Sequence, residues 1–288
     1  MPEKNIIWLA SYPKSGNTWF RVFLTNLLHE NEEPANINDL AEASISSSRK
    51  IFDDYTGLSS SDLTFEEIDQ LRPDVYRMQS EESSELLFKK AHDQYHRVKN
   101  GQSLFPPEIS KGVIYFARNP LDVMVSFAYH SAKPVSKMIH SINDADYAFC
   151  DKNDKLQNQL RQWLGSWSDH VKSWTEQTEI PVHIMRYEDM INHTYKHFKA
   201  AVEFIGLNKS EEQIKVAIKK SDFNVLSQQE SKEGFKEKMI KSKSFFRKGQ
   251  VGDWRNHLNE QEAQQIVNNH KNMMKKFGYL DENDELIF

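Results

Sequence analysis

The stretch from Ser11 to Trp19 contains the residue types that could bind a phosphate group. Its sequence, Ser-Tyr-Pro-Lys-Ser-Gly-Asn-Thr-Trp, places Lys14 two positions before Gly16. If a helix starts directly after this glycine, its first N–H groups, the positive end of its dipole and the lysine ammonium point at one spot. The loop therefore predicts an anion site. The alternative is an ordinary helix start whose serine and threonine only cap the first turn.

Lys90 and His92 form a second pair of chemically capable residues, at the end of an apolar run that begins at Leu86. Alternate residues of an extended strand face the same side, so the two side chains would project together. His92 and His96 also have the spacing of a metal pair on a helix, but the sequence supplies no evident third ligand. We therefore expect no metal. The alternative for His92 is an ordinary surface histidine, since the chain contains 11 histidines.

Arg118 follows the clearest buried strand of the sequence, residues 112–117, and lies two positions before Pro120. Proline is typical of a first helical turn, and a helix from Pro120 would contain Ser126. The planar guanidinium fork of an arginine matches the paired oxygens of a phosphate. Arg118 is thus a second candidate for anion binding, with an ordinary turn and a surface salt bridge as the alternative.

A third candidate anion site lies in the basic region from Lys232 to Lys248, which runs into Gly249. Glycine lets the backbone approach an anion closely because it has no side chain. The alternative is a solvated face, which a run of positive charge most often forms. The net charge of the whole chain is −5, so an anion site must be built locally, and a general affinity for nucleic acid is not expected.

Short apolar strands must position these residues, because most of them directly follow one. The strands are expected at residues 6–10, 86–92, 112–117 and 182–186. In open parallel sheets, ligands bind outside the carboxyl ends of the strands. Apolar spacing predicts helices that begin near Asn17, Pro120 and Asn259 and helices within 63–71, 156–174 and 207–220, with Trp163, Trp167 and Trp174 in the core. The sequence therefore predicts an α/β fold with a central, mostly parallel sheet flanked by helices.

Length and composition favour a single globular domain over residues 1–288, with 38% hydrophobic and 27% charged residues. No apolar run reaches the roughly 20 residues that a membrane span needs. The N-terminal Met1-Pro-Glu-Lys lacks the blocks of a signal peptide. The single cysteine, Cys150, cannot form an internal disulfide and fits a reducing compartment. We expect a cytoplasmic protein.

Together these motifs resemble those of the sulfotransferases that use 3′-phosphoadenosine-5′-phosphosulfate (PAPS), from about Ile6 to Phe277. The loop does not match that of nucleotide triphosphatases, which needs Gly, four residues and then Gly-Lys-Ser/Thr. It is similar to the family's 5′-phosphosulfate loop, with Asn17 in place of a threonine. Further similar segments are Lys90-Ala91-His92, with alanine for threonine, Arg118-Asn119-Pro120 with Asp122 one position early, Tyr187-Glu188-Asp189, Ser221-Asp222-Phe223 and Arg247-Lys248-Gly249-Gln250-Val251-Gly252-Asp253-Trp254.

The resemblance implies a role for each matching residue. The cofactor-binding residues it implies at the phosphosulfate loop are Lys14, Ser15, Gly16, Asn17, Thr18 and Trp19. Those it implies around the 3′-phosphate are Arg118, Ser126, Arg247, Lys248 and Gly249, and those near the adenine and ribose are Tyr187, Ser221 and Phe223. His92 would be the catalytic base, and Lys14 and Lys90 would stabilise developing charge. Ser126 would help to hold Lys14 until the acceptor arrives.

The resemblance also implies an acceptor with a hydroxyl group, a phenol or alcohol before an amine, and adenosine 3′,5′-bisphosphate (PAP) as the product. The aromatic and aliphatic content of residues 32–79 and 133–154 favours a small, partly apolar acceptor over a highly charged glycan. Residues 32–79 and 133–154 are expected to shape the acceptor site, the second as a lid or else a surface excursion, and residues 227–254 to close over the cofactor. The dimer element of many animal members is not evident at residues 257–260. Two other functions stay open: a nucleotide kinase or triphosphatase that needs Mg²⁺, and a nucleotide-binding module without catalysis.

Overall fold

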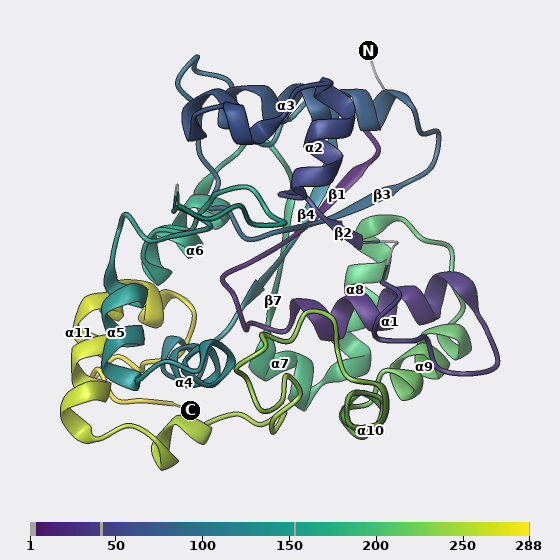
Figure 1. Ribbon diagram of the computed structural model, residues 1–288. Helices are drawn as coiled ribbons and strands as arrows, with labels where there is room; N and C mark the ends of the chain where they lie inside the picture. The colour runs from purple at the N-terminus through teal and green to yellow at the C-terminus, as the bar shows by residue number, and fades with distance from the viewer. Residues whose placement is uncertain (1–3, 41–42, 153, 288) are drawn as a thin grey trace. The chain divides into compact units, whose positions relative to one another are not determined.

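A computed structural model describes residues 4–40, 43–152 and 154–287 and alternates strands with helices (Figure 1). Residues 1–3, on which the expectation of no signal peptide partly depends, lie outside the described residues. The chain divides into two compact units of three segments each. Unit 1 comprises Met1–Tyr12, Glu42–Tyr115 and Ala145–Ile184, and unit 2 comprises Pro13–Ala41, Phe116–Asp144 and Met185–Phe288. The single domain over residues 1–288 stays a prediction.

Five strands form the central sheet. They are β1 (Ile6–Ser11), β2 (Ala43–Ile45), β3 (Leu87–Ala91), β4 (Ser110–Ala117) and β7 (Val182–Arg186), in the spatial order β2-β3-β1-β4-β7. Strand β3 runs parallel to both β1 and β2, with Ala91 opposite Ala10 and Lys90 opposite Ile45. Every residue of β1 is buried, as expected for an apolar strand with neighbours on both sides. The predicted α/β fold with a central parallel sheet is confirmed.

The other elements of unit 1 are mainly helices. They are α2 (Arg49–Thr56), the short 3₁₀ helix η1 (Ser60–Asp62), α3 (Phe65–Glu81), the strands β5 (Ala148–Phe149) and β6 (Gln162–Trp163), and α6 (Trp167–Glu176). Helices α2 and α3 pack side by side (Figure 1). In the core, the Trp8 ring of β1 lies edge-on to Phe105, with 4.8 Å between ring centroids, and to Tyr76 of α3, at 5.1 Å.

The elements that lie wholly in unit 2 are helices. They are α1 (Asn17–His29), α4 (Pro120–Ser131), α5 (Val135–Asn143), α7 (Tyr187–Asn192), α8 (Thr194–Ile205), α9 (Glu211–Lys220), α10 (Phe223–Glu233), the 3₁₀ helix η2 (Asp253–Asn256) and α11 (Glu260–Lys276). Helix α9 contacts both α1 and α8, and α11 contacts α4 and α5 (Figure 1). The rings of Phe20 and Phe23 in α1 pack on Phe198 of α8, with centroids 5.5 and 4.6 Å apart. Among the described residues, no helix has both the length and the apolar character needed to cross a bilayer.

Several helix boundaries agree with their capping signals, and one does not. Helices α9 and α11 begin with capping boxes at Ser210 and Asn259, as the sequence indicates. The helix expected over 63–71 is wrong in its bounds, because Thr64 caps α3 through a box with Glu67 and the helix continues through Pro73.

Two segments differ from their predicted structure. Residues 133–154, the segment expected to be a lid or a surface excursion and for which no helix was predicted, contain α5 and β5, because the apolar residues from Met138 to Ile142 bury one face of a helix. The helices predicted within 156–174 are found only from Trp167, as α6, since residues 162–163 pair with β5. Trp163 is 37% exposed and is therefore not a core residue, whereas Trp167 and Trp174 are fully buried.

Candidate functional site

The loop between β1 and α1 has an unusual backbone, as the phosphate-binding prediction requires. Lys14 has a φ of 72° and Gly16 a φ of 103°, so both adopt left-handed conformations, which are uncommon for a residue with a side chain. A turn with left-handed residues can direct successive backbone N–H groups into a concave surface that binds anions. A Cβ atom at Gly16 would lie 2.9 Å from the Tyr187 ring, so the site also requires glycine for space.

The first turn of α1 has no capping side chain. Its N-cap is Gly16, and no side chain forms a capping hydrogen bond there. The alternative that a serine and a threonine only cap this helix is therefore wrong. The Ser15 hydroxyl oxygen is buried and has no hydrogen-bond partner among the described residues. A buried hydroxyl without a partner is costly, and an anion at the N-terminus of α1 would satisfy it.

The Lys14 ammonium lies over an aromatic ring. Its nitrogen is 3.6 Å from the centroid of Phe245, which belongs to the predicted closing segment 227–254. The ring is held in place because the N–H groups of Phe245 and Phe246 donate to the carboxylate of Glu230, at 2.6 and 2.9 Å. This cation–π contact connects the loop after β1 to the closing segment.

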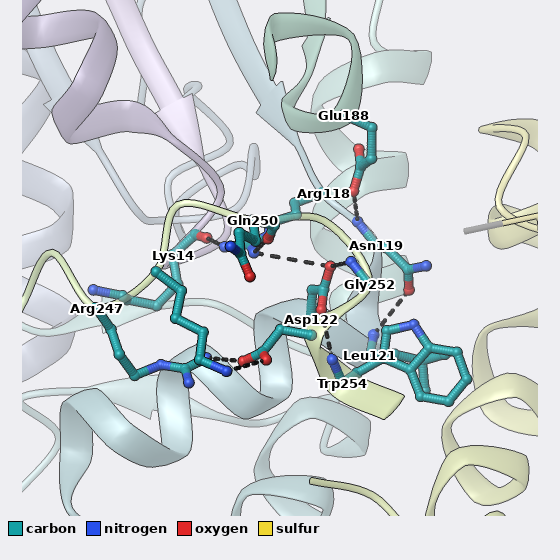
Figure 2. A network of polar contacts seen from close by, with 12 residues as sticks. Lys14, Arg118, Asn119, Leu121, Asp122, Glu188, Arg247, Gln250, Gly252 and Trp254 are labelled. Carbon is teal, nitrogen blue, oxygen red and sulfur yellow. Dashed lines mark hydrogen bonds and ion pairs between the residues drawn. The ribbon is translucent and has the colours of Figure 1, made fainter. Parts of the chain in front are cut away.

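Arg118 connects the same two parts of unit 2 (Figure 2). Its guanidinium donates to the carbonyl oxygens of Lys14 and Gln250, at 3.1 and 3.0 Å, and lies over the ring of Tyr187, 4.1 Å from the centroid. Arg118 is 8% exposed, and its Nε atom has no hydrogen-bond partner among the described residues. The guanidinium therefore retains an N–H donor for a ligand.

Asp122 anchors the end of the closing segment. Its carboxylate accepts hydrogen bonds from the N–H groups of Gly252, at 2.7 Å, and Trp254, at 3.0 Å (Figure 2). It also lies 3.8 Å from the Arg118 guanidinium. Asp122 thus fixes the glycine-rich motif beside Arg118.

Asp253 holds the two cations of the Arg-Lys-Gly motif. Arg247 and Lys248 both form ion pairs with its carboxylate, the lysine at 2.6 Å, and His257 lies 3.1 Å from it. Burial raises the pKa of Asp253, but hydrogen bonds from Lys248, Arg247 and Asn256 outweigh this effect and hold the pKa well below its usual value. The Asp253 carboxylate therefore keeps the two cations together beside Asp122 and Arg118.

Replacing Asp253 by asparagine is expected to lower stability by roughly 1–3 kcal/mol at neutral pH, because charged hydrogen bonds are lost. The folded pKa is lowered, so this contribution is present above the ordinary carboxyl pKa of about 4 and is lost as pH falls below it. Thermal unfolding of both proteins from pH 7 to pH 3 should show the difference shrinking below about pH 4. An exposed control, Asp62→Asn, should lack this pattern; equal behaviour of the two variants would contradict the assignment.

Two residues predicted to lie near the adenine, Tyr187 and Phe223, contact other predicted site residues of unit 2. Tyr187 begins α7 and is 7% exposed, and its ring is edge-on to Trp19, with 6.3 Å between centroids. Burial raises the pKa of Tyr187, while the Arg118 charge acts in the opposite direction. Phe223 begins α10 and borders Gly249, where a Cβ atom would lie 2.6 Å from its ring. These residues surround the region between the loop and the closing segment of unit 2.

Two predicted residues have less direct support. Ser221 is fully buried, and its hydroxyl donates to the Ala217 carbonyl of α9 at 2.9 Å, so its place at the adenine stays a prediction. Ser126 is partly exposed in α4. The ammonium of Lys14 lies over the ring of Phe245. The role of Ser126 in holding Lys14 also stays a prediction.

His92 follows β3 directly, in unit 1. Its Nδ1 atom lies 2.9 Å from the Ser11 carbonyl oxygen at the end of β1. Because a carbonyl oxygen can only accept, this contact places a proton on Nδ1, and in the neutral imidazole the lone pair is then on Nε2. The imidazole is therefore held in the tautomer that can accept a proton at Nε2. The ring of Phe149 lies edge-on to it, with 6.4 Å between centroids.

The two lysines at the end of β3 face opposite sides of the strand. Lys90 is partly exposed and shares a side with His92, as predicted. Lys89, which the sequence analysis did not single out, is 8% exposed and donates to the Ser44 hydroxyl at 3.2 Å. Burial lowers the pKa of Lys89 to about 8. Lys90 and His92 belong to unit 1, whereas all the other predicted site residues belong to unit 2.

The sequence analysis missed two residues that organise the site in unit 2. Phe245 contacts Lys14, and Glu230 holds Phe245. The position of Phe245 two residues before Arg247 is a signal that could have identified it. Glu230 had no local signal, because its partners are 15 and 16 residues away. In the described parts of the chain, no group of three or more His, Cys, Asp or Glu side chains is arranged to hold a metal ion.

Comparison with known proteins relates this geometry to one family. A family model described as "Sulfotransferase domain" matches residues 4–278. The chain is 29% identical to Cytosolic sulfotransferase 5 of Arabidopsis thaliana over 269 residues, which cover 89% of this chain and 76% of that protein. It is 28% identical to Flavonol 3-sulfotransferase of Flaveria bidentis over 277 residues, 91% of this chain and 79% of that protein.

The fold is also similar to that of solved structures. One is retinol dehydratase in complex with androsterone and the inactive cofactor PAP. Its TM-score is 0.64 at 19% identity, with 98% of this chain and 84% of that chain covered. At this level of identity the likeness concerns the fold.

Proposed function

This chain belongs to the sulfotransferase domain family, and on that premise we propose that it transfers a sulfonate group from PAPS to a hydroxyl group of a small, partly apolar acceptor. The observation that carries the proposal is the link made by Arg118, which joins the loop at Lys14 to the segment at Gln250. A donor with a phosphate group at both its 5′ and 3′ positions needs two such anion sites close together. The chain is an enzyme of the sulfotransferase class.

The residues of unit 2 fit the donor. The Ser15 hydroxyl and the Arg118 Nε atom are buried without partners among the described residues, and the first turn of α1 has no capping side chain. We propose that the loop and α1 bind the 5′-phosphosulfate, and that Arg118, Arg247, Lys248 and the backbone at Gly249 bind the 3′-phosphate. Solved structures of similar fold contain PAP, which supports the same donor.

His92 is the proposed general base. Its Nδ1–H donates to the Ser11 carbonyl, so its Nε2 can take the proton from the acceptor hydroxyl as the oxygen attacks sulfur. Lys14 and Lys90 would neutralise the charge that develops on the sulfonyl oxygens and the departing phosphate. The donor supplies the sulfonate group and leaves as PAP. Since ammonium and backbone N–H groups supply the positive charge, we propose that no metal is required.

The acceptor class is proposed from the relatives and from residues near His92. One relative is named for a flavonol, a compound with phenol groups. One solved structure is a complex with androsterone, which carries an alcohol group. The aromatic rings of Phe149 and Tyr147 lie in the β5 region, edge-on to each other with 5.9 Å between centroids. This favours an acceptor with an apolar ring system. We also propose a cytoplasmic location, which the names of several relatives support.

Calorimetry with PAP, followed by transfer assays with PAPS and a mixed library of phenols, alcohols and amines, tests the proposal. We expect PAP to bind and mass spectrometry to detect sulfated phenols or alcohols. EDTA should leave the rate unchanged, whereas a nucleotide kinase or triphosphatase would lose activity. PAP binding without transfer to any acceptor would point to the non-catalytic module, and no affinity for PAP would overturn the proposal.

Replacing Gly249 by alanine is expected to weaken PAP binding about 10-fold, because displacement of a binding segment is costly. Gly249 has a φ of 61°, and the added Cβ would lie 2.6 Å from Phe223. Gly234→Ala is a matched control, since Gly234 has a φ of 75° in the same closing segment but no atom within 4 Å of the added Cβ. Calorimetry should show weaker binding only for the first variant. Equal affinities would remove Gly249 and Phe223 from the cofactor site.

A further inference from the structure

A buried chain of hydrogen bonds ends on the backbone of His92. His170 of α6 is fully buried in unit 1, and its Nε2 atom lies 3.1 Å from the His92 carbonyl oxygen. Its Nδ1 atom lies 2.8 Å from the hydroxyl of Tyr115 in β4. The Tyr12 ring packs edge-on against the imidazole, with 5.4 Å between centroids. His170 thus connects β4, through α6, to the catalytic segment after β3.

The partners of His170 determine its protonation. The His92 carbonyl can only accept, so Nε2 carries the proton and Nδ1 accepts from the Tyr115 hydroxyl. Both ring nitrogens are therefore used by a neutral imidazole. Burial lowers the pKa of His170 to about 4, in agreement with this neutral state. A neutral side chain with both of its polar atoms satisfied can be buried without a large cost.

Asp93, the residue after His92, is also held by buried hydrogen bonds. Asp93 is 1% exposed and accepts two hydrogen bonds from the Arg72 guanidinium, at 2.7 and 3.0 Å. Its backbone carbonyl accepts from the Trp174 indole at 2.9 Å, one turn of α6 after His170. Such a bidentate pair has a defined orientation. The His92 carbonyl, however, is held by His170, so displacement of His170 would release the backbone of His92 before that of Asp93.

We propose that His170 is a positioning residue for the reaction: as a neutral donor fixed by Tyr115, it holds the His92 backbone so that the imidazole keeps its hydrogen bond to Ser11. This inference rests on the proposed function, because it assumes that His92 is the base. The three-point support explains why a histidine is found on a helix face that otherwise carries Trp167, Val171 and Trp174. General-base catalysis requires this precision, since small misplacements of a catalytic group cost large factors in rate.

Two substitutions at one position separate positioning from stability. In His170→Gln the side chain keeps one donor and one acceptor, and we expect a kcat within about 3-fold of the wild type. In His170→Leu both are lost, and we expect kcat to fall about 10-fold or more with unchanged affinity for PAP. His270→Leu, at a buried histidine of α11 that is 2% exposed, is the matched control for the cost of removing a buried imidazole. It should lower the melting temperature and leave kcat unchanged.

Nitrogen NMR of the histidine rings adds a readout that a purely structural role would not change. In the wild type, His92 should show a protonated Nδ1 and His170 a protonated Nε2. In His170→Leu and in Tyr115→Phe, the His92 signals should shift toward a mixture of tautomers. If His170→Leu does not fold, Tyr115→Phe and His170→Gln still test the idea through kcat and these signals.

The outcomes are distinct. Wild-type protein that neither binds PAP nor transfers sulfonate would overturn the proposed function itself. An active wild type whose His170→Leu and Tyr115→Phe variants keep both kcat and the His92 signals would overturn the positioning role alone. A loss of PAP affinity in His170→Leu equal to its loss of kcat would also contradict the role, because it would indicate general distortion.

Discussion

His92→Ala is expected to slow sulfonate transfer by about 10²-fold or more, because a positioned general base contributes a factor of this size. The affinity for PAP should stay near that of the wild type, since the proposed role of His92 is to take a proton from the acceptor and not to bind the donor. The affected quantity should be kcat, measured under saturating donor and acceptor. Calorimetry with PAP on the same preparation separates catalysis from binding.

His96→Ala provides the control for this prediction. His96 is four residues further along and partly buried, and its Nδ1 atom lies 2.9 Å from the Gln94 carbonyl, so it resembles His92 in its backbone contact. We expect its turnover to be unchanged. A rate for His92→Ala equal to that of the wild type would remove His92 from the reaction. Equal losses in both variants would indicate that the strand end is distorted or that the two histidines act as a pair.

Arg118→Ala is expected to weaken PAP binding by about 10²-fold, because both a charged fork and its hydrogen bonds are lost. The same change leaves Asp122 buried, 2% exposed, with its nearest cation removed. Breaking such a buried pair typically costs about 3–5 kcal/mol, so a lower melting temperature is expected as well. Arg118→Lys keeps the charge without the fork and should lie between the wild type and the alanine variant.

A ligand pair makes this prediction specific to the 3′-phosphate. The wild type should bind PAP much more tightly than AMP, which lacks the 3′-phosphate, and in Arg118→Ala this preference should nearly disappear. Arg255→Ala is the control, because Arg255 is exposed and its guanidinium lies over the ring of Trp254, 4.4 Å from the centroid. It should keep the preference. If Arg118→Ala loses affinity for both ligands equally, Arg118 supports the loop at Lys14 and does not bind the 3′-phosphate.

Local signals in the sequence predicted much of the fold. The apolar run from Ile6 to Ala10 gave β1, and the spacing after Asn17 gave α1. Capping residues such as Ser210 and Asn259 fixed helix starts because their side chains bond to N–H groups within the next turn. Helix α5 was missed because its apolar face is short and lies among Pro, Asn and Asp residues.

The sequence by itself determined which residues can do chemistry and that most of them follow strands. Ligands bind outside the carboxyl ends of parallel strands, so the residues that follow β1, β3 and β4 were candidates for a site from their place in the sequence alone. The capacity of Lys14, Arg118 and His92 to bind or accept charge is likewise a property of their side chains.

Only the tertiary structure decided what each of these groups contacts. Arg118 bonds to carbonyl groups 104 and 132 residues away. His92 receives its tautomer from Ser11, 81 residues away, and its backbone support from His170, 78 residues away. No periodicity or capping pattern encodes such pairings, because they depend on which surfaces fold against each other. Residue type therefore set the available chemistry, and long-range packing set its protonation and position.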